Sequence, residues 1–147
     1  SINVIAMLIG FIALMAVINA LLGLIHPALG LNTIFGYLFY PLAWVMGVPK
    51  AEVMQVATMM GQKLTINEFV AYTSLISAKA TMSPKAIAIA SFALCGFANF
   101  SSVGIQIGGI GELAPSRRAD LAKLGLKALL CGTLASYLSA TIAGILM

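Results

Sequence analysis

Residues 50–80 read KAEVMQVATMMGQKLTINEFVAYTSLISAKA, two apolar stretches around a polar centre, KLTINE at 63–68. The stretches at 51–62 and 69–78 hold roughly 10 to 12 residues each. As helices they would be about 15–18 Å long, half the depth of a hydrocarbon core of about 30 Å. Two half-length helices joined at a polar tip predict a re-entrant hairpin, which enters the membrane and returns. The alternative, an ordinary solvated loop at 63–68, would leave two arms too short to be complete spans.

Asn67 and Glu68 give this tip its chemistry. Asparagine is a favoured N-cap residue, so Asn67 is predicted to begin the second arm and to place that helix's N-terminal dipole near the middle of the membrane. A carboxylate at bilayer depth costs about 3 kcal/mol or more, and ionisable groups found there usually serve function. Glu68 is therefore the leading candidate for a functional residue.

Composition extends the membrane interpretation to the whole chain. Of its 147 residues, 61% are hydrophobic and 8% are charged, whereas soluble domains carry about 25% charged residues. The first charge is Lys50, and two further uncharged runs, 86–111 and 128–147, are each long enough for a helical span. These features predict an all-α integral membrane protein. The net charge of +4 is scattered over hydrophilic breaks and forms no patch for nucleic acid.

The N-terminal third divides into two predicted helices. Residues 1–28 are uncharged and have no proline before their last turn, which predicts a transmembrane helix. Residues 29–49 contain an internal proline and gather two tyrosines and a tryptophan, side chains that favour the membrane–water boundary. We expect an interfacial amphipathic helix there rather than a second span. Because the chain opens at Ser1 with neither methionine nor a signal-peptide cleavage pattern, we expect it to be part of a longer protein.

After the hairpin, predicted at 50–80, residues 83–114 form a long apolar run with a polar centre. Ser83 and Pro84 are a strong helix start. The centre, GFANFSS at 96–102, combines a glycine with hydrogen-bonding side chains. Non-helical backbone at membrane depth survives only where protein buries it or a wet cavity adjoins it. This pattern predicts a discontinuous transmembrane helix whose break faces the hairpin tip, a recurrent construction in secondary transporters.

Residues 115–147 are predicted to form a cytoplasmic connection followed by the last transmembrane helix. Residues 112–127 carry four basic side chains, and an excess of lysine and arginine in a short connection indicates the cytoplasmic side. The C-terminus is then expected outside.

The polar side chains at the break suit a hydrogen-bonding ligand. Asn99 offers both donors and an acceptor, which fits a polyhydroxylated molecule. Ser101 fits equally a supporting role at the site and one of satisfying backbone groups freed by the break. Phe97 fits equally a stacking face and an ordinary core position.

Other chemistries have little support. Cys95 and Cys131 lie in apolar runs without a CxxC pair and are expected to be buried thiols. His26 is the one histidine, and neither HExxH nor GxGD occurs, so we expect no metal site, no cofactor and no enzymatic activity. The glycines from Gly104 to Gly111 follow no strand, so close helix packing is favoured over a nucleotide loop.

Two longer motifs resemble those of a known family. Residues 61–72, GQKLTINEFVAY, resemble the signature of concentrative nucleoside transporters, and residues 93–109, ALCGFANFSSVGIQIGG, are similar to that family's second hallmark. The resemblance covers essentially the whole chain. It implies an inverted-repeat transporter fold, of which these residues are the second repeat, or C-terminal half. It also implies a homotrimer in which 2–47 face the other subunits.

The resemblance implies cation-coupled nucleoside uptake by alternating access, driven by Na+ or H+. Glu68, Asn99 and Ser102 would hold the ribose hydroxyls of a substrate such as uridine, with Phe97 lining the pocket and Asn67 and Ser101 supporting it. The first repeat, whose hairpin contacts the nucleobase, and the coupling-ion site would lie mostly outside this chain. A bacterial inner (plasma) membrane is the expected location. The alternative is a channel or a non-transporting nucleoside-binding protein on the same scaffold.

Overall fold

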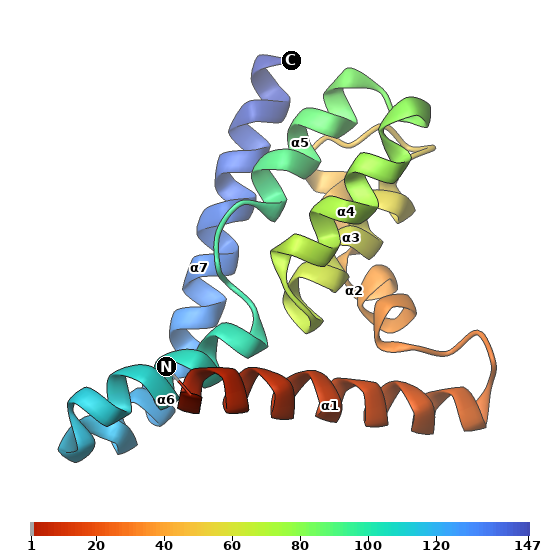
Figure 1. Ribbon diagram of the computed structural model, residues 1–147. Helices are drawn as coiled ribbons and strands as arrows, with labels where there is room; N and C mark the ends of the chain where they lie inside the picture. The colour runs from red at the N-terminus through yellow and green to blue at the C-terminus, as the bar shows by residue number, and fades with distance from the viewer. Residues whose placement is uncertain (1) are drawn as a thin grey trace.

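The computed structural model describes residues 2–147, and within that range every regular element is a helix and no strand occurs (Figure 1). The elements in chain order are α1 (Ile2–Ile25), α2 (Leu31–Val45), α3 (Val53–Thr65), α4 (Glu68–Ala78), the 3-10 turn η1 (Lys79–Thr81), α5 (Pro84–Leu94), α6 (Phe100–Leu113), the 3-10 turn η2 (Pro115–Arg117) and α7 (Arg118–Leu146).

Helices α3 and α4 form a hairpin with a tip much shorter than the sequence suggested. α3 continues to Thr65, so that only Ile66 and Asn67 separate the two helices. The predicted polar tip at 63–68 is thus wrong in extent, because most of its side chains sit on the last turn of α3 or the first turn of α4. The N-cap prediction is confirmed, since Asn67 Oδ1 accepts a hydrogen bond from the N–H of Val70 at 2.9 Å.

The apolar run after the hairpin is two helices rather than one. Ser83 caps α5 as expected, accepting from the N–H of Ala86 at 3.2 Å. α5 ends at Leu94, and the chain then runs without helix to Asn99 before α6 begins. Gly96 adopts a φ of +101° within this break, a conformation that side chains other than glycine rarely take. α5 and α6 leave the break in different directions (Figure 1).

The core lies where α2, α3, α5 and α7 meet. Helices α2 and α3 approach each other through two glycines: a Cβ on Gly61 would lie 2.8 Å from Cβ of Phe35, and one on Gly36 would lie 2.9 Å from Oγ1 of Thr58. Such contacts leave no room for any larger residue without a shift. The buried apolar side chains of this core include Phe39, Val53, Val56, Met60, Ile89, Leu94 and Tyr137.

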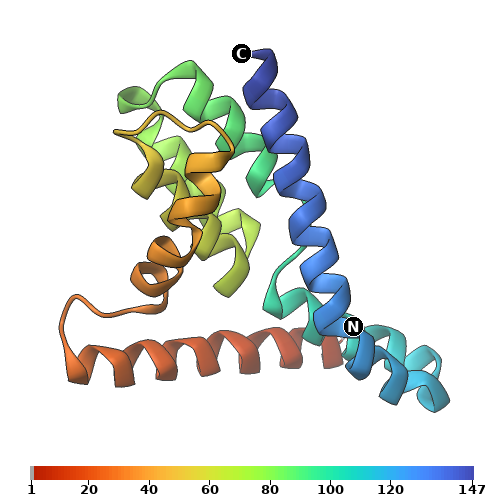
Figure 2. The same ribbon diagram turned by 180° about the vertical axis from the view of Figure 1, so that it is seen from behind.

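The two longest helices are not parallel. α1, 24 residues and about 36 Å long, runs across one end of the molecule, whereas α7, 29 residues and about 44 Å long, rises beside α5 (Figures 1 and 2). Among the described residues, Pro115–Leu146 is the one helical stretch whose length and hydropathy suit a complete span. The residues of the predicted connection and last span therefore form one helical stretch, the turn η2 followed directly by α7. The assignment of residues 1–28 as a span stays a prediction.

The surface of α7 is charged near its N-terminus and carries an apolar stripe further along. Leu126, Leu130, Leu134 and Leu138 recur every fourth residue and are each more than half exposed, so they form one stripe. Apolar stripes of this length on the outside of a helix are typical of lipid or protein contact within a membrane. The connection between α4 and α5 lies at the same end as the C-terminus, and the α6–α7 connection lies at the opposite end (Figure 1).

Candidate functional site

The hairpin tip and the break meet through Glu68 and Asn99. Asn99 Nδ2 donates a hydrogen bond to Oε2 of Glu68 at 2.8 Å, although 31 residues separate them in sequence. Glu68 is the first residue of α4, and Asn99 is the N-cap of α6. Two helix N-termini, each the partially positive end of its helix, therefore converge on one side chain.

Asn99 is held in a single orientation by its own helix. Its side chain is 1% exposed, and its Oδ1 accepts from the N–H of Ser102 and from Oγ of Ser101, each at 2.7 Å. The backbone N–H of Asn99 in turn donates to Oγ of Ser102 at 3.3 Å, which completes a capping box. Because these bonds fix the carbonyl oxygen of the amide, its nitrogen is directed at Glu68.

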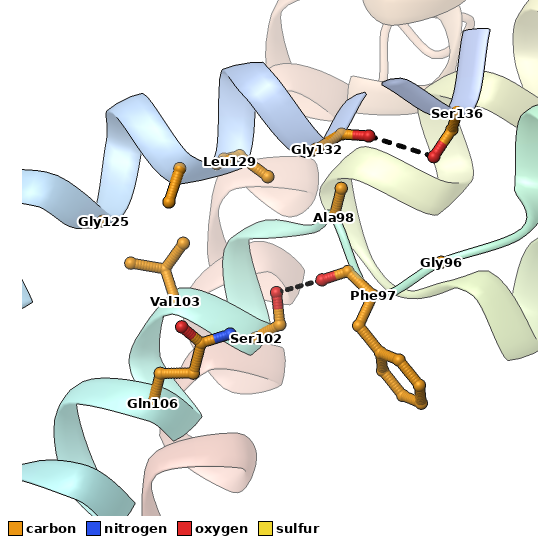
Figure 3. Close-up of a pocket in the computed structure, with 11 residues that line it drawn as sticks. Gly96, Phe97, Ala98, Ser102, Val103, Gln106, Gly125, Leu129, Gly132 and Ser136 are labelled. Atoms are coloured by element: carbon orange, nitrogen blue, oxygen red, sulfur yellow. Dashed lines mark hydrogen bonds between the residues drawn. The ribbon is translucent and has the colours of Figure 1, made fainter. Parts of the chain in front are cut away.

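The hydroxyl groups of the two serines donate hydrogen bonds to main-chain carbonyl oxygens or to the side chain of Asn99. The hydroxyl of Ser102 lies within bonding distance of the carbonyl oxygens of Phe97 and Asn99, at 2.7 Å from the latter (Figure 3). Oγ of Ser101 lies 2.7 Å from Oδ1 of Asn99 and 3.2 Å from the carbonyl oxygen of Ile66. Both serines thus satisfy groups left free by the break and the tip. In this arrangement a ligand meets the oxygen of Ser102 as an acceptor.

Phe97 is not a core residue of the described chain. Its side chain is 76% exposed, and its ring points away from α7 (Figure 3). Within the described chain the ring is therefore not packed in the core, and the two interpretations that the sequence left open, a stacking face and a core position, both stay predictions. The exposed ring face remains available for stacking.

One pocket collects all six predicted site residues. A cavity of about 180 Å³ is lined by Asn67, Glu68, Phe69, Phe97, Asn99, Ser101, Ser102 and Ile105. Small-molecule sites are usually about 300–1,000 Å³, so this cavity alone is small for a complete ligand site. Whether these residues bind ribose stays a prediction.

A second cavity lies on the other side of the break, towards α7. It measures about 290 Å³ and includes Gly96, Ala98 and Gln106 together with residues of α7 (Figure 3). It shares Phe97 and Ser102 with the first cavity. The break is therefore open on two faces within the described chain.

Two charged residues have partners that the sequence did not reveal. Lys63 is 1% exposed and donates from Nζ to the carbonyl oxygens of Ala93, at 2.9 Å, and Cys95, at 3.3 Å. Glu52 accepts from the N–H and from Oγ of Ser83, each at 2.6 Å. The signals available in the sequence were a lysine inside an apolar helix and a glutamate at the start of one, but their partners lie about 30 residues further along the chain.

The cysteines differ from expectation. Cys95 and Cys131 are both exposed in the described chain rather than buried, and neither forms a disulfide there. Cys95 is the C-cap of α5, at the start of the break, and Cys131 lies on α7.

Comparison with known proteins gives the context of this site. Residues 1–144 match the family model described as Na+ dependent nucleoside transporter C-terminus. An uncharacterized transporter of Bacillus subtilis, YutK, is 53% identical over 98% of this chain and 37% of its own length. The nucleoside permease NupC of Helicobacter pylori is 41% identical over 95% of this chain and 36% of its own length. A solved structure of the protein CNTnw, in an outward-facing state, superposes with a TM-score of 0.90 at 44% identity, over 99% of this chain and 38% of that one. The chain thus spans little more than a third of the length of these relatives.

Proposed function

The chain belongs to the family of Na+-dependent, or concentrative, nucleoside transporters, and on that premise we propose that it supplies the ribose-binding half of a cation-coupled nucleoside uptake site. Its relatives are transporters rather than enzymes, and it is an integral membrane protein. The single observation that supports the proposal is the contact of Glu68 with Asn99 over a pocket at two helix N-termini.

The chemistry of this pocket suits two neighbouring hydroxyl groups. The one hydrogen bond to the Glu68 carboxylate from within residues 2–147 comes from Asn99 and ends on Oε2. Ribose hydroxyls can donate to the remaining acceptor positions and accept from the second N–H of the Asn99 amide. Such bonds to an ionised group, away from water, are the stronger kind. A ligand without the hydroxyls would leave the carboxylate unpaired, and this penalty is the basis of selectivity.

The helices have roles that follow from this proposal. The α3–α4 pair is a re-entrant hairpin, and α5 and α6 are the halves of a discontinuous transmembrane helix that moves with it during alternating access. Residues 1–28 are a scaffold span, 29–49 an interfacial helix and 115–147 a cytoplasmic connection with the last span, which leaves the C-terminus outside. The N-terminal part of the transporter supplies the nucleobase contacts and the ion site. The assembly is a homotrimer in a bacterial inner membrane.

The test is uptake of labelled uridine by proteoliposomes that contain the full-length transporter. We expect Glu68→Gln to lower the transport efficiency, Vmax/KM, by about 100-fold, because two charge-assisted hydrogen bonds of about 1.5 kcal/mol each are weakened. Glu112→Gln is the matched control, since Glu112 is exposed at the far end of α6. Wild-type kinetics in both Glu68→Gln and Asn99→Ala would refute the site.

The same preparation separates the proposal from a channel or a nucleoside receptor. A transporter coupled to a cation accumulates uridine above the external concentration, and the accumulation disappears when the cation gradient is removed. A channel only equilibrates uridine, and a receptor binds it without uptake. Either of these results would replace the transport mechanism and leave the binding site in place.

A further inference from the structure

The ammonium group of Lys63 lies at the C-terminal end of α5, just before the break. Its two hydrogen bonds reach the carbonyl oxygens of Ala93 and Cys95, and α5 ends between them at Leu94. The last carbonyl groups of a helix lack partners within the helix and form the negative end of its dipole. Nζ also lies 5.9 Å from the centre of the Tyr137 ring, within the range of a cation–π contact.

The partners of this buried cation are neutral oxygens rather than a carboxylate. Among residues 2–147 the one salt bridge joins Arg117 to Asp120, so Lys63 has no acidic partner within 4 Å. Buried charges are tolerated only where polar groups compensate for lost water. Main-chain carbonyls at the C-terminal end of a half-helix are the groups with which transporters built from broken helices coordinate Na+. The surroundings of Lys63 Nζ are of that kind.

We propose that Lys63 is a built-in cation, whose ammonium group fills a carbonyl-lined cation position at the break of this half of the transporter. The inference rests on the proposed function. It means that this half needs no coupling ion of its own, and that removal of the ammonium group creates a site that a small external cation can fill.

The position also makes Lys63 a positioning residue for the substrate pocket. Lys63 precedes Glu68 by five residues, and its partner Cys95 precedes Asn99 by four. Its bonds therefore join the hairpin arm that leads to Glu68 with the end of α5 that leads to Asn99. Two neutral donors support the same helix end: Tyr72 reaches the carbonyl oxygen of Ser91 at 2.7 Å, and Ser136 reaches that of Cys95 at 2.9 Å. Neither of them bridges two carbonyls of α5.

The experiment measures uridine uptake by the full-length transporter in proteoliposomes at a constant Na+ gradient. Lys63→Ala removes the ammonium group and leaves space, Lys63→Met keeps the length of the side chain without its charge, and Lys79→Ala is a control at an exposed lysine of η1. We expect Vmax/KM to fall at least about tenfold in both Lys63 variants, because a charged hydrogen-bond donor is lost. Methylammonium chloride should restore much of the loss in Lys63→Ala only, and choline chloride, whose cation is too large, should restore none.

A second measurement is the thermal unfolding midpoint of the purified variants in detergent. Methylammonium should raise the midpoint of Lys63→Ala but not that of the wild type or of Lys63→Met. Wild-type uptake by Lys63→Met overturns the proposal, and so does a Lys63→Ala variant that no small cation restores in either measurement. Those results leave the ribose site intact provided that Glu68→Gln is still defective. If Glu68→Gln transports normally, the proposed function itself fails.

Discussion

The α3–α4 hairpin has a glutamate at each end, and the two carboxylates are held in different ways. At the base, Glu52 begins α3 and binds the residue that begins α5, with one oxygen on the N–H and the other on the hydroxyl of Ser83. At the tip, Glu68 begins α4 and faces the residue that begins α6, but Asn99 donates to only one of its oxygens. Both carboxylates thus lie between two helix N-termini.

The difference lies in what remains free. The positive ends of two helices lie near the carboxylate both at the base and at the tip, so the helix dipoles do not distinguish the two sites. Glu52, which is half-buried, uses both oxygens within the chain, and its two bonds to Ser83 join the start of α3 to the start of α5. Glu68 keeps acceptor capacity and opens onto the cavity with Phe97 and Asn99. Both sites carry a carboxylate, so charge alone does not distinguish them. The candidate site at Glu68 differs from the structural contact at Glu52 because Glu68 has acceptor positions without a hydrogen-bond partner in the described chain.

The largest predicted effect concerns selectivity at the tip. Wild-type transporter should prefer uridine to 2′,3′-dideoxyuridine by about 100-fold in Vmax/KM, because the analogue leaves the Glu68 carboxylate unpaired. In Glu68→Gln the preference should shrink to about tenfold or less, since a neutral amide loses less when left without a partner. Competition between the two labelled nucleosides in one uptake assay measures the ratio. An unchanged ratio would assign ribose recognition to another part of the transporter.

Local signals in the sequence predicted the parts of this comparison that depend on neighbouring residues. The caps formed by Asn67 and Ser83, each bonded to an N–H group three residues later, follow from short-range preference and were predicted. Asn99 caps α6 in the same way, but from the sequence it was assigned only to the break. A glycine-bearing break was likewise visible at 96–102, because polar residues interrupt an apolar run, although residues 100–102 belong to the first turn of α6.

The remaining parts depend on contacts between distant segments. Nothing within a few residues of Lys63 shows that its ammonium group reaches the end of α5, 30 residues later. Because the sequence places Lys63 in a polar tip, it predicts that α3 ends at residue 62 and not at Thr65. The partnership of Glu52 with Ser83 was hidden for the same reason. The course of α1 across the end of the molecule was also beyond prediction, because an apolar run fixes the length of a helix and not its direction.

An intermediate effect is expected when the amide at the break is shortened. Asn99→Ser keeps an oxygen that can cap α6 but removes the donor to Glu68, so the two functions of Asn99 are separated. Serine is nearly as good an N-cap as asparagine, and stability should change by no more than about 0.5 kcal/mol. The KM for uridine should rise about tenfold, the value of roughly one hydrogen bond to a charged group.

Two measurements on Asn99→Ser decide whether Asn99 binds the substrate or only stabilises the break. Uridine uptake gives the KM, and thermal unfolding of the purified protein gives the stability. A loss of stability without a change in KM would mean that Asn99 serves only the break, and the tip would then resemble the base. A higher KM at unchanged stability would sharpen the contrast between the two carboxylates.

The smallest effect on transport is expected at the base of the hairpin. Glu52→Gln replaces one acceptor oxygen by an amide nitrogen and removes the charge, so the bonds to Ser83 weaken, and the free energy of unfolding should fall by about 1–2 kcal/mol. Uridine Vmax/KM should stay within about threefold of the wild type, because Glu52 contacts no part of the pocket. Ser83→Ala and the double variant complete a cycle whose coupling energy, expected at about 0.5–3 kcal/mol, isolates the pair. A fall in uptake as large as that of Glu68→Gln would show that the base sets the geometry of the tip, since a fastening that merely stabilises the hairpin cannot change how tightly the far end binds.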